Sequence, residues 1–377
     1  MWLLNTQTAE LKYFNRPEDV PGRGYAILSH VWGDMTQEDT FQKVRDMGQL
    51  RKRRYDSSAD SQSTPHDPFT DAAYYRPLQY DPTQALPPQL FSVSEDHTDN
   101  TIEAHTDPPS NISVKIRNFL FQARKDGFEW AWADTCCIDK SSSAELTEAI
   151  NSMFLYYSLS TVCYVYLSDV HSGRGNNGFD NSRWHKRGWT LQELLAPKTV
   201  RFMLSDWTYL GTKFELAEKL EQITLIPRDV LRFKVDVTDT SVAQRMFWAS
   251  SRITTRVEDE AYCLFGLFGI NMPTLYGEGR NAFFRLQEEI MRTSVDTTLF
   301  SSGSPWPVTT KYQLRQCLRE EILLCPDTLP LLAPHPASFI GKRIFCEQHH
   351  LELVYILIIT SLIRNILTWY PAQWRRV

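Results

Sequence analysis

The sequence predicts an α/β protein, in which a parallel sheet flanked by helices is followed by a mostly helical extension. Short segments typical of buried strands alternate with helical patterns of about 10–15 residues, as in parallel sheets with helices on both faces. Strand-like segments stop near residue 210, while helical patterns continue. A chain of 377 residues with 42% hydrophobic residues is also long enough to bury a sizeable core.

Four segments are predicted as strands, because β-branched, aromatic and small apolar residues run together in each. They are Tyr25–Trp32, Glu129–Thr135, Thr161–Leu167 and Thr199–Met203. In parallel sheets, ligands bind beyond the carboxyl ends of the strands. We therefore expect functional residues at the ends of these segments.

Helices are predicted from apolar residues that recur at helical spacing. Ile112–Asp126 is the first, and Ser142 with Glu145 forms a capping box before the second. The extension is predicted to contain Phe214–Ile223, Ser241–Ser250, Asp259–Phe268 and Arg280–Thr293. We expect one core to contain Trp130, Trp132, Ile150, Phe154, Val162 and Tyr164.

Composition divides the chain into five parts. Residues 1–50 begin the α/β domain and residues 111–210 complete it. Between them, residues 51–110 are rich in Asp, Ser, Thr, Pro and His, so we expect a disordered insertion. Residues 211–300 form the helical extension, and residues 301–377 are poorly defined. Arg364 and Asn365 interrupt the apolar tract 351–367, which is too short to span a bilayer about 30 Å thick.

Charge and cysteine content limit the class of protein. A formal net charge of −5 predicts neither nucleic-acid nor membrane partners, and the basic run 51–54 is expected to be a solvated patch. The seven cysteines are an odd number without metal-binding spacing, and the first residues do not resemble a signal peptide. We therefore expect a cytoplasmic protein with reduced thiols and no metal site.

Polar and aromatic residues cluster at three of the predicted strand and loop ends, in residues 29–34, 132–139 and 184–193. Trp189 and Glu193 lie four residues apart, on one face of a helix. A glutamate with aromatic walls and hydrogen-bond donors suits glycosyl transfer or hydrolysis. The alternative is that Trp189 is a core residue and Glu193 a solvated residue paired with Lys186 or Arg187.

Other chemistries have weaker support. A triad of Ser29, His185 and Asp134 lacks the GxSxG turn that exposes a nucleophilic serine. A pair of Cys137 with His30 or His185 is disfavoured, because buried adjacent cysteines are usually structural. Phosphate-binding glycine motifs are absent from the sequence.

Three blocks of the sequence carry a family resemblance: YAILSHVWGDMTQEDTF at 25–41, WAWADTCCIDKSSSAELTEAINSMFLYY at 130–157 and RGWTLQELLAP at 187–197. They resemble the fungal heterokaryon-incompatibility (HET) domain, and residues 241–290 are similar to the extension of many HET proteins. The resemblance covers most of residues 1–340. HET domains are in turn similar to Toll/interleukin receptor (TIR) domains, so the resemblance implies a TIR/flavodoxin-like parallel sheet.

The resemblance also implies a function. In NAD-cleaving TIR enzymes a glutamate follows a helix tryptophan by four residues, as Glu193 follows Trp189. It implies Glu193 as the catalytic carboxylate and Ser29, Trp32, Asp134 and Trp189 as residues that bind NAD(+), a substrate rather than a tightly bound cofactor. The alternative is a non-catalytic, self-associating signalling module.

Either form would trigger fungal cell death after non-self recognition, as a homo-oligomer or with an upstream recognition protein.

Overall fold

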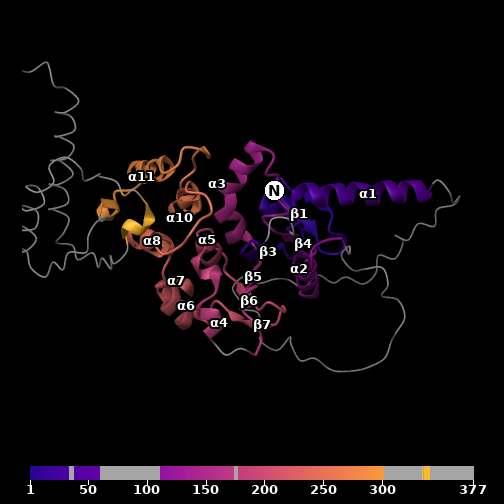
Figure 1. The fold of residues 1–377 in the computed structure, drawn as a ribbon, viewed down its shortest axis with the longest axis horizontal. Coiled ribbons are helices and arrows are strands. Elements are labelled where there is room, and N and C mark those ends of the chain that lie inside the picture. Colours follow the sequence, from indigo (N-terminus) through magenta and orange to yellow (C-terminus); the bar gives the residue numbers. More distant parts are fainter. Residues whose placement is uncertain (34–37, 60–110, 174–176, 301–332, 334, 340–377) are drawn as a thin grey trace, which may run out of the picture.

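A computed structural model describes residues 1–33, 38–59, 111–173, 177–300, 333 and 335–339 (Figure 1). Most of the predicted insertion, most of residues 301–377 and the apolar tract 351–367 lie outside these described residues. None of the helices within them is long and apolar enough to cross a membrane.

The centre of the molecule is a seven-stranded sheet in the order β2-β1-β4-β3-β5-β6-β7. The four predicted strands are β3 (Tyr25–His30), β4 (Trp130–Trp132), β5 (Val162–Tyr166) and β6 (Val200–Met203), and they are parallel. The other three are β1 (Trp2–Asn5), β2 (Leu11–Tyr13) and β7 (Tyr209–Thr212), which pair antiparallel.

The predicted parallel sheet is therefore confirmed for these four strands, and the three additional strands make the whole sheet mixed. The β1–β2 and β6–β7 connections are short, and short turns can join only antiparallel strands. In chain order, the parallel strands lie 2-1-3-4 across the sheet, so the direction of the connections reverses between β3 and β5. Such a reversal is where α/β sheets bind ligands.

Strand β3 is buried on both faces, and its side chains alternate between two layers of helices. Toward one face, Tyr25 Oη donates to Tyr156 O of α3 (Ser143–Leu159) at 2.5 Å, and Ser29 contacts Glu193 of α5 (Thr190–Leu195). Toward the other face, His30 contacts Lys115 of α2 (Val114–Lys125). The last two residues of β3 thus point to opposite faces of the sheet.

Helix caps follow the local sequence. Ser142 caps α3 as predicted, because its hydroxyl accepts a bond from Glu145 N at 3.3 Å, and Ser113 caps α2 in the same way. One element was not expected: α1 (Phe41–Ala59) continues past residue 51 into the segment predicted to be disordered. The Arg, Lys and Ala content of this part favours a helix even though it lacks an apolar pattern.

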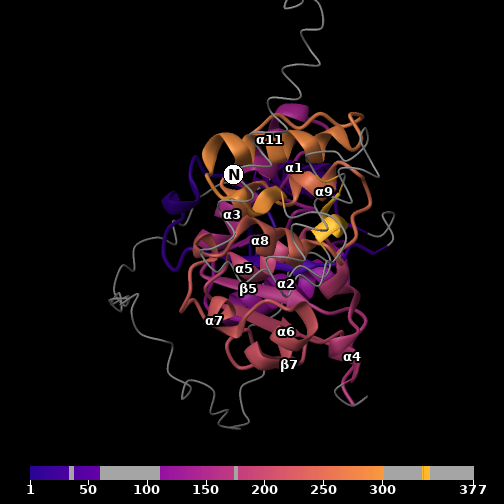
Figure 2. The ribbon, with the colours of Figure 1, turned by 90° about the vertical axis from the view of Figure 1, so that its left-hand side faces the viewer.

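The extension is helical, as predicted, and gathers at the end of the molecule opposite α1 (Figures 1 and 2). The predicted helix 259–268 is instead two short helices, separated at Cys263 and Leu264. The α-helices of the extension are α6 (Ala217–Thr224), α7 (Arg228–Leu231), α8 (Val242–Ala249), α9 (Asp259–Tyr262), α10 (Phe265–Phe268) and α11 (Asn281–Thr293).

The described residues also form the short helix α4 (Asn177–Asp180) and the 3₁₀ helices η1 (Pro17–Asp19), η3 (Arg183–Lys186), η4 (Val237–Asp239), η5 (Thr297–Phe300) and η6 (Pro336–Phe339).

The hydrophobic core is continuous between the sheet and the extension. The predicted core residues are all buried except Phe154, which is partly buried and packs against this core. It lies where α10 packs on α3, since a Cβ added at Gly266 would be 2.0 Å from Phe154 Cβ. The α/β part and the extension therefore share one core.

Candidate functional site

The candidate site lies beyond the carboxyl end of β3, where residues 183–190 lead into α5. Ser29 Oγ donates a hydrogen bond to Glu193 Oε2 and accepts one from Trp184 Nε1 at 2.7 Å. Ser29 and Trp184 are fully buried, and Glu193 is 7% exposed. The structure thus joins two of the predicted site residues, Ser29 and Glu193, through a direct hydrogen bond.

The environment of Glu193 favours its neutral form. Burial raises the pKa of Glu193 to about 7, against the opposing influences of Arg187, the Ser29 hydrogen bond and Arg252. The expectation of a solvated Glu193 is therefore wrong, because tertiary packing encloses this face of α5. A carboxyl group that titrates near neutral pH is typical of functional sites.

Asp134 forms a second cluster, with His30 and Trp32. Its carboxylate lies 3.0 Å from His30 Nε2 and accepts a bond from Trp32 Nε1 at 2.7 Å. The Lys115 ammonium, which can only donate, lies 2.9 Å from His30 Nδ1. His30 Nδ1 must therefore accept and Nε2 must carry the proton, so His30 is neutral.

The surroundings of this cluster lower the pKa of both His30 and Asp134. Burial lowers the pKa of His30, and the nearby Lys115 charge adds to this effect. Burial alone raises the pKa of Asp134, but the His30 hydrogen bond and the charges of Lys140 and Arg187 outweigh it and hold this pKa well below its usual range. Asp134 is therefore a carboxylate at neutral pH.

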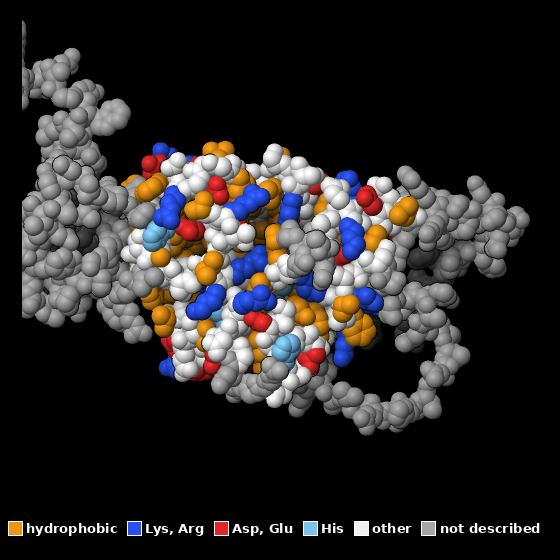
Figure 3. Space-filling view, viewed as in Figure 1, with side chains coloured by type: hydrophobic (Ala, Val, Ile, Leu, Met, Phe, Trp, Pro, Cys, Tyr) orange, Lys and Arg blue, Asp and Glu red, His pale blue; other side chains and the backbone are white. Residues whose placement is uncertain are grey.

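Trp32 forms the partly exposed rim of the site. Lys140 Nζ lies 3.9 Å and Arg187 Cζ 4.9 Å from the centre of its ring, within the range of cation–π attraction. Lys and Arg side chains extend across the middle of the surface seen in Figure 3. This rim offers an aromatic ring, two cations and the Asp134 carboxylate to a ligand.

Trp189, the remaining predicted site residue, has a different partner. Its side chain hydrogen-bonds with Asp259 of α9, and it packs partly buried against the core. It therefore connects the start of α5 to the extension, while Trp184 is the tryptophan hydrogen-bonded to Ser29.

Sequence reasoning missed the roles of Trp184, Arg187 and Arg252. Trp184 and Arg187 lie in the same block as Glu193, and their proximity along the chain was an available signal. Arg252 comes from a distant segment, and nothing in the sequence indicates its contact.

The disfavoured nucleophilic sites are not formed. Ser29 bonds with Glu193 and Trp184, whereas His185 Nε2 lies 3.0 Å from Phe179 O. Burial raises the pKa of Cys137 to about 12, so its reactive thiolate form is scarce at neutral pH. Within the described part of the chain, no group of three His, Cys, Asp or Glu residues could hold a metal ion.

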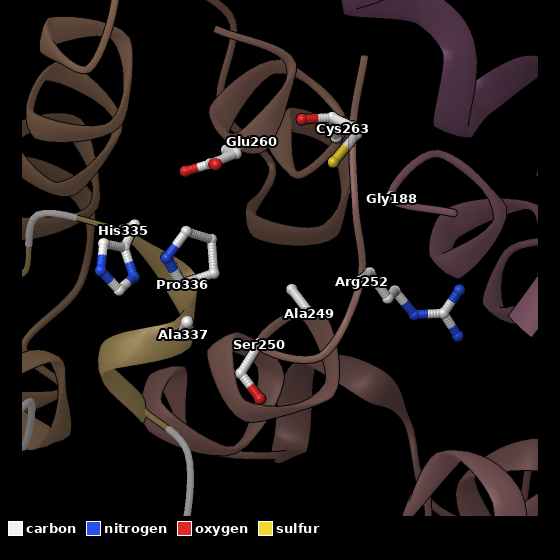
Figure 4. A pocket seen from close by; sticks show the side chains of 10 residues that line it. Gly188, Ala249, Ser250, Arg252, Glu260, Cys263, His335, Pro336 and Ala337 are labelled. Carbon is white, nitrogen blue, oxygen red and sulfur yellow. The ribbon is translucent and has the colours of Figure 1, made fainter. Parts of the chain in front are cut away.

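A cavity of about 60 Å³ lies on the extension side of the site (Figure 4). Its lining includes Gly188, Arg252, Glu260 and His335, but not Ser29 or Glu193. The Arg252 guanidinium points away from Glu260 and His335 (Figure 4). The cavity therefore borders the 184–190 segment without reaching the Glu193 carboxyl group.

Comparison with known proteins shows a similarity over part of the chain. The family model described as Heterokaryon incompatibility protein (HET) matches residues 82–180. The vegetative incompatibility protein HET-E-1 of Podospora anserina is 40% identical over 235 residues, which cover 58% of this chain. The match spans only 17% of the length of that relative, and no solved structure matches the chain. Over the matched residues, the chain is therefore similar to HET-domain proteins.

Proposed function

We propose that this protein acts in vegetative (heterokaryon) incompatibility in fungi, by triggering cell death after non-self recognition. The proposal is supported by the HET match and by the similarity to a protein named for vegetative incompatibility. We further propose that it kills by TIR-like hydrolysis of NAD(+), with Glu193 as the catalytic carboxylate. The proposed location is the cytoplasm, where NAD(+) is available.

The placement of Glu193 carries the enzymatic part of the proposal. A carboxyl group with a pKa of about 7 lies at the point where the parallel strand order reverses, oriented by Ser29 and Trp184. The order 2-1-3-4 of the parallel strands also begins as in flavodoxin-like sheets, which supports the proposed TIR-like fold.

In the proposed reaction, the bond between ribose C1′ and the nicotinamide nitrogen breaks, and its electron pair leaves with nicotinamide. The ionised Glu193 stabilises the positive charge that develops on the ribose. Water then adds to C1′ and loses a proton, giving ADP-ribose. Ser29, Trp32, Asp134 and Trp189 are the proposed NAD(+)-binding residues, and Lys140 and Arg187 provide positive charge beside Trp32.

The alternative proposal is a non-catalytic module that self-associates and signals death through partner proteins. The 7% exposure of Glu193 favours it, since the enzyme would have to open this region before the carboxylate could reach ribose. In this alternative, the bond from Ser29 to Glu193 serves only to hold α5 on β3. Both alternatives include a homo-oligomer and an upstream recognition protein.

The decisive experiment compares wild type, Glu193→Gln and Glu129→Gln, the last being an exposed carboxylate on the same domain. Each purified protein is clustered artificially and incubated with NAD(+), and nicotinamide release is measured. Cell death is measured separately, in cells that express each protein at the same level. We expect Glu193→Gln to lower the rate by roughly 10²–10³-fold, as does loss of one electrostatic group in an active site. Full killing by Glu193→Gln with intact NAD(+) would refute the catalytic proposal and leave the signalling module.

A further inference from the structure

The helical extension contacts the site through a backbone bridge. Ile253 N donates to Lys186 O at 2.6 Å, and Gly188 N donates to Ile253 O at 2.9 Å. Arg187 and Ile253 form a parallel bridge outside the main sheet. Residues 252–254 therefore run alongside residues 186–188, immediately before the helix that carries Glu193.

Arg252 adds side-chain bonds to this bridge. Its Nη1 donates to Arg187 O at 3.0 Å and to Thr190 Oγ1 at 2.9 Å, while its Nε donates to Trp248 O at 3.3 Å. The Thr190 hydroxyl also lies 2.6 Å from Trp184 O and 2.8 Å from Arg187 O. One guanidinium thus connects the end of α8 to Arg187 in the middle of the 184–190 turn and to Thr190 at its end, and Thr190 in turn bonds to Trp184 O.

The two segments approach so closely that a side chain at residue 188 would force atoms to move. A Cβ added at Gly188 would lie 2.5 Å from Thr254 Cγ2 and 3.3 Å from Cys263 Sγ. A separation under 3.0 Å forces atoms to move. The contact between the turn and the extension is therefore sterically specific.

Helix α5 needs such support because it is only 6 residues long, and its N-cap, Trp189, makes no side-chain capping bond. Helices this short are not stable on their own in water. At the other end of α5, Lys213 donates to Leu194 O and Pro197 O at 2.9 and 2.6 Å. Hydrogen-bond donors of two basic side chains from later in the chain therefore hold both ends of the helix.

We propose that the helical extension is an integral part of the site, in which Arg252 is a positioning residue that fixes the 184–190 turn and thereby places the Glu193 carboxyl group beside Ser29. This inference deepens the proposed function and rests on it for its catalytic consequence. It predicts that neither Arg252 of the extension nor Gly188 of the turn that it contacts can be changed without altering the environment of Glu193.

The pKa of Glu193 can be used to test the role of Arg252, because the charge of Arg252 acts on this pKa. The groups that act electrostatically on Glu193 or are affected by it are Arg187, Asp134, Tyr157 of α3, Cys163 of β5 and Arg252. Arg252 favours the ionised form of Glu193, so its loss must move the ionisation of Glu193 to higher pH.

The first test uses the full chain with Arg252→Met, Arg252→Lys and the control Arg292→Met, an exposed arginine of α11. The ionisation midpoint of Glu193 is obtained from the pH dependence of stability, by comparing each protein with the same protein carrying Glu193→Gln. We expect the midpoint to rise in Arg252→Met, to move less in Arg252→Lys, and to stay unchanged in Arg292→Met. Amide exchange at Gly188 should also be faster in Arg252→Met. An unchanged midpoint with unchanged exchange would overturn the proposal.

The second test remains informative if Arg252→Met does not fold. Gly188→Ala should increase amide exchange in the turn and lower NAD(+) cleavage, and adding Thr254→Ala should reverse much of both effects by removing the clashing methyl group. Failure of Thr254→Ala to reverse the increased exchange would overturn the proposal. If the wild type cleaves no NAD(+), the enzymatic part of the proposed function fails, but the exchange and midpoint measurements still decide whether Arg252 positions Glu193.

Discussion

Replacing Glu193 by glutamine should change how the stability of the protein depends on pH. The pKa of Glu193 rises from 4.5 to about 7 on folding, chiefly because the side chain is buried. Between these values the folded protein keeps a proton that the unfolded chain has lost, so stability falls as pH rises through this window. Below pH 4.5 this stabilisation is complete, and above pH 7 it is lost.

The size of the effect follows from the pKa difference. A shift of about 2.5 units corresponds to about 3 kcal/mol at about 1.4 kcal/mol per unit, and most of it falls between pH 5 and 8.5. Glutamine has nearly the same shape, can still accept the Ser29 hydrogen bond and does not titrate. The stability of wild type relative to Glu193→Gln should therefore decrease by about 2–3 kcal/mol from pH 5 to pH 8.5.

Urea or thermal unfolding of both proteins at each pH measures this difference, because titrations common to both largely cancel. In domains of 150–250 residues about 1 kcal/mol shifts the melting temperature by about 2–4 °C, so the expected change is several degrees. Glu129→Gln, at an exposed position, should show no such trend. A stability difference that is constant with pH would refute the reasoning that burial raises this pKa.

Three further substitutions test the packing and the polar network. Gly266→Ala should cost about 1–3 kcal/mol by overpacking, since its Cβ would lie 2.0 Å from Phe154 Cβ, and adding Phe154→Gly, which removes that Cβ, should recover part of the loss relative to the sum of the two single substitutions in unfolding experiments. Absence of any recovery would contradict the packing of α10 on α3. Trp184→Phe removes the hydrogen-bond donor to Ser29 and should lower the free energy of unfolding by about 1–3 kcal/mol. The control Trp130→Phe removes an indole nitrogen that has no hydrogen-bond partner, so it should lower the free energy of unfolding less. Equal losses in the two variants would argue against a stabilising role for the Trp184 bond. Burial lowers the pKa of Lys213 from 10.5 to about 7, so between these values the unfolded chain holds a proton that the folded protein lacks. The stability of wild type relative to Lys213→Met should therefore increase from pH 7 to pH 10, by up to about 4 kcal/mol. A decrease over this range would contradict a lowered pKa of Lys213.

The strands that sequence reasoning recovered are those with strong local signals. Strand β3 is buried at every residue, and β4 and β5 are buried almost throughout, so apolar residues run without interruption. Of the missed strands, β2 is a mostly exposed edge strand, β7 is a partly exposed edge strand, and β1 is only four residues long. Their pairing depends on neighbours in the sheet, which a local pattern does not reveal.

Part of the site could also be predicted, because some of its residues belong to strands with strong local signals. Ser29 and Asp134 lie near the carboxyl ends of β3 and β4, two of the predicted parallel strands, and the carboxyl ends of such strands share one edge of the sheet. The hydrogen bond from Ser29 to Glu193 fits that expectation. The helical spacing of Trp189 and Glu193 could not reveal that the indole bonds with Asp259 of α9, because Asp259 lies 70 residues further along the chain.

By itself, the sequence determined the parallel strands, the helices between them, the family resemblance and the position of Glu193 on a short helix. These properties depend on residue order within segments of about 5 to 20 residues, where periodicity and capping act. Only the tertiary structure decided that Glu193 is enclosed and titrates near pH 7, and that Arg252 holds the turn before it. Desolvation and long-range hydrogen bonds depend on which distant atoms surround a group, and that is settled only when the extension packs against the sheet.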